Sequence, residues 1–310
     1  MVKSTISPEE FVSTARWLRD PQKSMAIRFR ALFTLKNIGG QSAIDHIGKV
    51  LFEDDSALLK HECAYCLGQM QDVYAIEILS KVLANTMEHP MVRHEAGEAL
   101  GAIGTDECLK ILQNYVNDSS KDVAETAQLA VNRIKYLRNC SEEQTTTSDS
   151  DHSIYSSVDP APALGLKNDD QKKIENLRLV LIDPNESLFK RYQSMFSLRN
   201  LNTDESAMAL ADGLDCQDSA LFRHEIAFVL GQMQRPITTA KLAKVLAEKS
   251  ENEMVRHECA EALGAIATDE TNQILKNYLN DDVRVVRESA IVALDVSDYN
   301  NSEQFQFLNN

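Results

Sequence analysis

The residues best suited to chemistry in this chain are four His-Glu dipeptides, at His61-Glu62, His94-Glu95, His224-Glu225 and His257-Glu258. They contain four of the seven histidines. The two dipeptides of each pair are 33 residues apart, and the second pair repeats the first 163 residues later. Imidazole nitrogens and carboxylate oxygens are common ligands of transition metals, so the pattern predicts a duplicated metal site.

The remaining histidines serve as an internal control. His46 corresponds to Ala209 and His89 to Asn252 at the same offset, and His152 lies in a polar stretch between the halves. Only the His-Glu positions are duplicated as histidines, which favours a chemical role for them over a structural one.

Each half supplies two histidines and at least one carboxylate, the set found in non-haem iron sites with open coordination positions. Two halves therefore predict two irons. Zinc remains an alternative, although structural zinc prefers closed sites with cysteine or histidine, and no cysteine is duplicated here. Adjacent helical residues point about 100° apart, so a histidine and the following glutamate either approach a metal from different flanks or divide their duties. The four glutamates need not all be ligands.

The elements that position these residues are predicted to be helices. Asp20-Pro21 recurs as Asp183-Pro184, and Gly68-Gln69-Met70 as Gly231-Gln232-Met233, at the same offset of 163. A finer period of about 31 to 33 residues indicates stacked repeats, and apolar spacings of three and four indicate helices. The segments VRHEAGEALGAI and VRHECAEALGAI resemble the second helix of a HEAT-type repeat.

The predicted fold is all-α, an α-solenoid of eight HEAT-like helical hairpins in two pseudo-symmetric halves. Four hairpins are expected between residues 8 and 138 and four between 171 and 296. The domains are then residues 1–138, a flexible acidic linker at 139–170, and residues 171–310 with a short polar tail. The linker is assigned because Ser, Thr, Asp and Glu occur there without apolar periodicity.

Composition narrows the class of protein. The chain has 310 residues, 43% of them apolar, which supports ordered cores. A formal charge of −15 argues against nucleic acid as a partner and favours a cationic one. No stretch approaches the roughly 20 apolar residues of a membrane span, no secretion signal is visible, and the six cysteines form no paired framework. We therefore expect a cytoplasmic protein without membrane contact.

Four His-Glu motifs on eight HEAT-like repeats, divided by an acidic linker, resemble the deoxyhypusine hydroxylase family over nearly the whole chain. The resemblance implies an oxidoreductase of hypusine biosynthesis, a monooxygenase with a dinuclear iron centre between the two halves. Its partner would be translation initiation factor 5A, whose deoxyhypusine side chain it would hydroxylate in a post-translational modification. O2 would be the co-substrate, and an external electron donor, which the sequence does not identify, is required.

By position, the resemblance implies that His61, His94 and Glu95 bind one iron, and that His224, His257 and Glu258 bind the other. Glu62 and Glu225 would face the substrate as catalytic and substrate-binding residues. Uncoordinated carboxylates can hold the ammonium groups of a cationic side chain by charge-assisted hydrogen bonds. The sequence by itself treats the two glutamates of each half alike.

Two further sets of residues follow the motif histidines along the same helical face. Glu98 and Glu261 come four residues after His94 and His257, where they could accept a ring N–H, line the path of the substrate amine, or belong to a solvated face. Glycines come seven residues after each histidine, leaving room for substrate or allowing tight helix packing, at Gly68, Gly101, Gly231 and Gly264.

A metal-free HEAT-like interaction scaffold is the main alternative function. A bilin lyase with similar short repeats and a zinc-dependent hydrolase are further alternatives. A scaffold has no need of a duplicated His-Glu set, so the iron content of the purified protein separates these readings.

Overall fold

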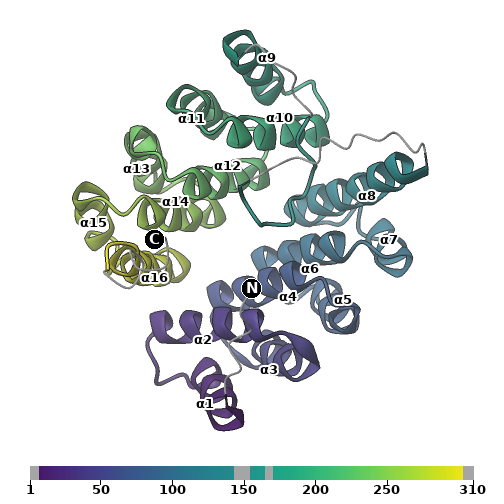
Figure 1. Cartoon of the computed structure of the whole chain (residues 1–310), viewed down its shortest axis with the longest axis vertical. Coiled ribbons are helices and arrows are strands. Elements are labelled where there is room, and N and C mark those ends of the chain that lie inside the picture. The colour runs from purple at the N-terminus through teal and green to yellow at the C-terminus, as the bar shows by residue number, and fades with distance from the viewer. Residues whose placement is uncertain (1–6, 143–153, 165–169, 303–310) are drawn as a thin grey trace. The chain divides into compact units, whose positions relative to one another are not determined.

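The chain forms an all-helical repeat structure, seen in a computed structural model that describes residues 7–142, 154–164 and 170–302 (Figure 1). The described residues contain sixteen α-helices, three short 3-10 helices and no strand. None of these helices is long and apolar enough to cross a membrane. The predicted α-solenoid of eight helical hairpins is confirmed. Linker residues 143–153 and 165–169 and the polar tail from residue 303 lie outside the described residues.

The helices belong to two compact units, residues 1–127 and 128–310. The first contains α1 (Pro8–Arg19), α2 (Met25–Ile38), α3 (Gly40–Glu53), α4 (Ala57–Met70), η1 (Val73–Ala75), α5 (Ile76–Ala84), α6 (Pro90–Ile103) and α7 (Asp106–Gln113). Helix α8 (Lys121–Glu142) passes from the first unit into the second. The second contains α9 (Asp170–Ile182), α10 (Leu188–Leu201), α11 (Asp204–Ala211), η2 (Asp212–Asp215), α12 (Ala220–Met233), η3 (Pro236–Thr238), α13 (Thr239–Ala247), α14 (Glu253–Ile266), α15 (Asp269–Lys276) and α16 (Arg284–Asn300).

The helices that carry the His-Glu motifs all begin at the same distance from the histidine. In each, an N-cap side chain accepts a hydrogen bond from a backbone N–H of the first turn, which replaces a partner that the helix itself cannot supply. Each cap lies five residues before its histidine, at Ser56, His89, Ser219 and Asn252. The caps therefore fix how far along its helix each motif stands.

Glycines set the spacing between these helices. A Cβ on Gly68 of α4 would lie 2.7 Å from Ala99 Cα of α6, and one on Gly231 of α12 would lie 3.1 Å from Ala262 Cα of α14. A Cβ on Gly264 would lie 2.5 Å from the Ala293 carbonyl oxygen of α16. At these three positions the missing side chain serves tight helix packing rather than leaving room for substrate.

The predicted linker differs from the structure in two places. Helix α8 runs on to Glu142, so residues 139–142 are helical, because polar residues extend an established helix without breaking it. Residues 154–164 have no regular secondary structure but contact α10, and Pro160 and Ala161 are buried. The polar composition of the whole stretch made the few buried residues within it hard to recognise from the sequence.

Gly264→Ala should lower the free energy of unfolding by about 1–3 kcal/mol, because the added methyl group meets the backbone of α16. Gly97→Ala in α6 is the matched control. Its Cβ would make contacts of 3.4 Å or more, all with side-chain atoms, so the better helix propensity of alanine should leave stability unchanged or raise it by up to about 1 kcal/mol. Denaturant unfolding measures both, and equal effects would contradict the packing explanation.

Candidate metal centre

In the first unit, α4 and α6 bring His61, His94 and Glu95 together. One potential ligand atom from each lies within 4.8 Å of the others, and all three residues are buried. The Nε2 atom of His61 is 3.2 Å from Glu95 Oε2, and the centroids of the two imidazole rings are 5.4 Å apart. Two nitrogens and one carboxylate oxygen thus converge within reach of a single metal ion.

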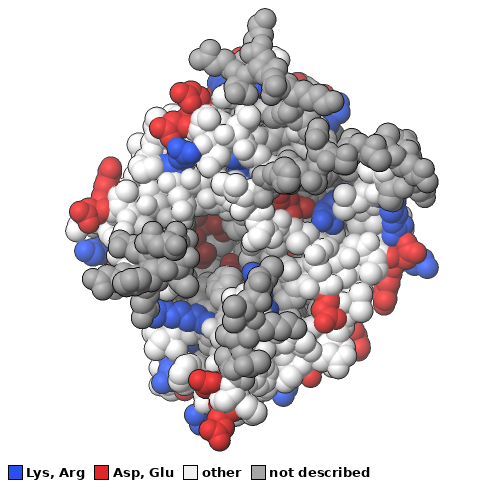
Figure 2. Space-filling view, viewed as in Figure 1, with Lys and Arg blue, Asp and Glu red and all other residues white. Residues whose placement is uncertain are grey.

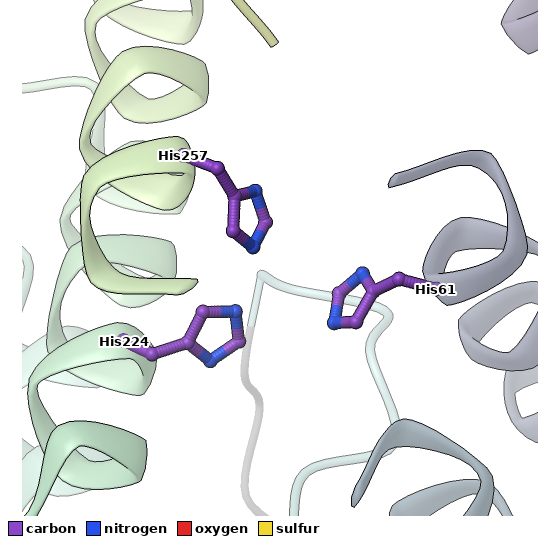
Figure 3. A group of neighbouring side chains, drawn as sticks. All are labelled: His61, His224 and His257. Atoms are coloured by element: carbon purple, nitrogen blue, oxygen red, sulfur yellow. The ribbon is translucent and has the colours of Figure 1, made fainter. Parts of the chain in front are cut away.

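The second unit repeats this arrangement on α12 and α14. Figure 3 shows the His224 and His257 rings projecting in the same direction from the two helices, with ring centroids 5.3 Å apart. Glu258 Oε2 lies 3.4 Å from His224 Nε2 and 3.9 Å from His257 Nε2. The three residues predicted as one ligand set are therefore neighbours in the folded unit.

Glu62 and Glu225 lie beside these sets and are also buried, with 8% and 3% of their surface exposed. Glu62 Oε1 is 3.6 Å from Nδ1 of His61, whereas Glu95 faces Nε2 of the same ring. The two glutamates around His61 thus occupy different sides of the imidazole. Their division into a ligand and a substrate-binding residue stays a prediction.

Glu261 is positioned against the ring of a predicted ligand. Its Oε1 atom lies 3.6 Å from His257 Nδ1 and accepts a hydrogen bond of 3.1 Å from the Ser289 hydroxyl. This placement favours orientation of the imidazole over contact with a substrate. Glu98, four residues after His94 on α6, is half-buried, and its substrate-binding role remains a prediction.

The first-unit site is rich in buried negative charge. Burial lowers the pKa of His61, but the carboxylates of Glu95 and Glu62 outweigh that effect and raise it well above its ordinary value. Buried carboxylates require a nearby positive charge, which a protonated histidine or a bound cation can supply. The electrostatics thus suit a metal cation.

Sequence reasoning missed Tyr65, which lies one helical turn after His61. Burial, together with the charges of Glu62, Glu95 and Glu98, raises the pKa of its phenol well above the ordinary value. The corresponding residue of the second half is Phe228. The two candidate ligand sets therefore have different neighbours. A comparison of the positions at which the two halves differ would have pointed to Tyr65.

A second missed feature is the cation directly before each motif histidine: Lys60, Arg93, Arg223 or Arg256. Arg93 donates from Nε to the Leu83 carbonyl at 2.9 Å, and from Nη1 and Nη2 to Asp118 at 3.1 and 2.7 Å. Arg256 pairs in the same way with Leu246 and Asp281. Lys60 pairs with Glu88, and Arg223 with Glu251.

These cations fix the rotation of the motif helices. Arg93 ties α6 both to the end of α5 and to the turn before α8. Because the adjacent residue is His94, that constraint also sets the direction in which the His94 Cα–Cβ bond leaves the helix. The acidic partners lie 25 or 28 residues after the cations. This spacing recurs in both halves of the sequence and could have predicted the pairs.

The fold and the site together define a HEAT-repeat protein with a buried His/Glu set in each half. A family model described as HEAT repeats matches residues 44–132 and 207–295. Deoxyhypusine hydroxylase from Drosophila pseudoobscura pseudoobscura is 52% identical over 302 residues, covering 97% of this chain and 96% of that protein. The enzyme from Homo sapiens is 49% identical with the same coverage.

The solved structure of human deoxyhypusine hydroxylase in complex with glycerol has a TM-score of 0.86 and 50% identity, covering 94% of this chain and 96% of that one. The chain belongs to the deoxyhypusine hydroxylase family. Family membership makes hydroxylation its class of reaction.

Asp118→Asn should lower stability at neutral pH by about 1.5–3 kcal/mol, because it removes the charge that Arg93 binds. The hydrogen bonds from Arg93 lower the pKa of Asp118. Its stabilising contribution is therefore present above the unfolded value of about 4 and is lost as the pH falls through the lowered folded value. Wild type and variant should converge in acid, as measured by denaturant unfolding across pH.

The control for this experiment is Asp212→Asn, which removes the carboxylate that Arg178 and Lys241 bind, outside the motif helices. Both substitutions should destabilise the protein, but only Asp118→Asn should weaken metal binding. Equal metal affinity in the two variants would refute the link between the Arg93 anchor and His94.

Proposed function

We propose that this chain hydroxylates the deoxyhypusine side chain of translation initiation factor 5A to hypusine, with O2 and two bound irons. The observation that carries the proposal is the duplicated His/Glu set on buried helices of a chain about half identical to deoxyhypusine hydroxylases over nearly its full length. We further propose a cytoplasmic location, supported by the cysteine pattern of the sequence.

The residues present fit iron. Each unit offers two imidazoles and one carboxylate, and such a set leaves coordination positions open for O2. His61, His94 and Glu95 would hold one ion, and His224, His257 and Glu258 the other. The two irons would activate O2 so that one oxygen atom enters a C–H bond and the other leaves as water, with two electrons from an external donor and two protons.

The chain's own residues contribute charge and position. The side chains of Glu62 and Glu225 carry the negative charge that attracts the ammonium groups of deoxyhypusine, and their burial strengthens that attraction. Glu261 Oε1 lies 3.6 Å from Nδ1 of His257, where its charge would favour one orientation of that ring. Figure 2 shows both acidic and basic side chains on the face that it draws. We assign recognition of the cationic side chain to the buried carboxylates.

Purified protein should contain close to two irons per chain, and His61→Ala or His224→Ala should lower that content. Loss of one of three ligands leaves too few donors to retain the ion. Metal analysis after anaerobic reconstitution measures this. Zinc alone would reject the iron assignment, and a protein without metal would favour the interaction scaffold.

Glu62→Gln and Glu225→Gln should retain iron better than Glu95→Gln and Glu258→Gln do, yet bind the deoxyhypusine-containing factor more weakly. Losing a charge-assisted contact costs about 1.5–3 kcal/mol, which is roughly ten-fold or more in affinity. Iron content and binding of the factor are measured on the same preparations. Iron loss in Glu62→Gln with full retention in Glu95→Gln would reverse the assigned roles.

A further inference from the structure

Residues 154–164, within the predicted linker, form an ordered strap against the second unit; we call this segment the strap. Its Leu164 N–H donates to the Ser197 hydroxyl at 2.8 Å, and the Asp159 carbonyl accepts from Arg133 Nε at 2.8 Å. Ala161 is completely buried. The strap is thus attached to α8 and α10 through both backbone and side chains.

The strap is centred on Arg199 of α10, which is only 1% exposed. Asp159 accepts from both terminal nitrogens of the guanidinium, at 2.8 and 2.5 Å. The rings of Tyr155 and Phe196 lie 4.6 and 4.8 Å from its central carbon. Because a buried guanidinium needs a charged partner, Arg199 and the strap require each other.

This cluster also holds α12, the helix of His224 and Glu225. The side-chain amide of Gln232 accepts from Arg199 Nη1 at 2.9 Å and donates to the Ser157 hydroxyl at 3.0 Å. Gln232 lies seven residues after Glu225, about two helical turns, and therefore on the same face of α12. Fixing the Gln232 amide at both ends fixes the rotation of that face.

The first half has no such cluster among the described residues. Lys36 corresponds to Arg199 and lies 5.8 Å from the centroid of Phe33. Phe33 is 36% exposed, whereas its counterpart Phe196 is fully buried. The candidate ligand sets are duplicated, but among the described residues such a cluster is found only beside α12, the helix that contains Glu225.

We propose that Ser157, Asp159 and Arg199 are positioning residues that act through Gln232 to orient Glu225 toward the cationic side chain of the substrate. The proposal rests on the proposed function for the identity of the substrate. The positioning itself is a property of the fold and can be measured without turnover. The strap thereby makes the two carboxylates beside the ligand sets unequal in substrate binding.

The test compares Asp159→Asn and Gln232→Leu with Lys36→Ala, the control at the corresponding position of the first half. In the full iron-loaded chain, the first two should raise KM and the Kd for deoxyhypusine-containing factor about ten-fold, with unchanged iron content and a smaller change in kcat. Hydrogen exchange should accelerate at residues 225–232 in these variants. Lys36→Ala should behave as wild type.

Thermal unfolding separates positioning from simple destabilisation. A lower Tm with unchanged KM, Kd and hydrogen exchange at 225–232 would overturn the proposal, as would loss of iron in either variant. Ser157→Ala, a milder change, should show a smaller effect in the same direction. If wild type does not hydroxylate the factor but exchange at 225–232 still responds, the proposed function fails while the positioning by the strap stands.

Discussion

The structure depends on buried arginines that join successive repeats. Arg28, Arg93, Arg191 and Arg256 each donate from Nε to a carbonyl ten residues earlier and bind an aspartate in a following turn. A buried guanidinium is costly without partners, so each helix has one rotation that satisfies it. In α6 and α14 the next residue is a motif histidine, so the interaction that stabilises the repeat also orients the helix face that carries the candidate metal ligands.

Much of this organisation was predictable because it follows from periodicity. Helical spacing and the 163-residue offset gave the hairpins, and identical spacing of the dipeptides implied that they meet on neighbouring helices. The remainder depends on tertiary contacts. Nothing local distinguishes Gly231 as a packing contact, and Asp159 looks like any linker acid until Arg199 is buried against it. Contacts of long sequence separation leave no periodic signal.

The two halves repeat the candidate metal ligands but not the residues around them. At the 163-residue offset, Tyr65 corresponds to Phe228 and Lys36 to Arg199. In the described part of the chain, Arg199 binds Asp159 of the strap, whereas Lys36 has no such segment beside it. If the site binds the cationic side chain proposed above, these differences would let it distinguish the two ends of that side chain.

The position of the motif helices within each unit has a consequence for how the protein unfolds. Helices α4 and α6 belong to the middle repeats of the first unit, and α12 and α14 to those of the second. In a repeat array each hairpin is stabilised mainly by its nearest neighbours, so fraying begins at the terminal hairpins. The outer repeats of a unit then unfold first. When they do, the two helices that carry its histidines remain packed against each other.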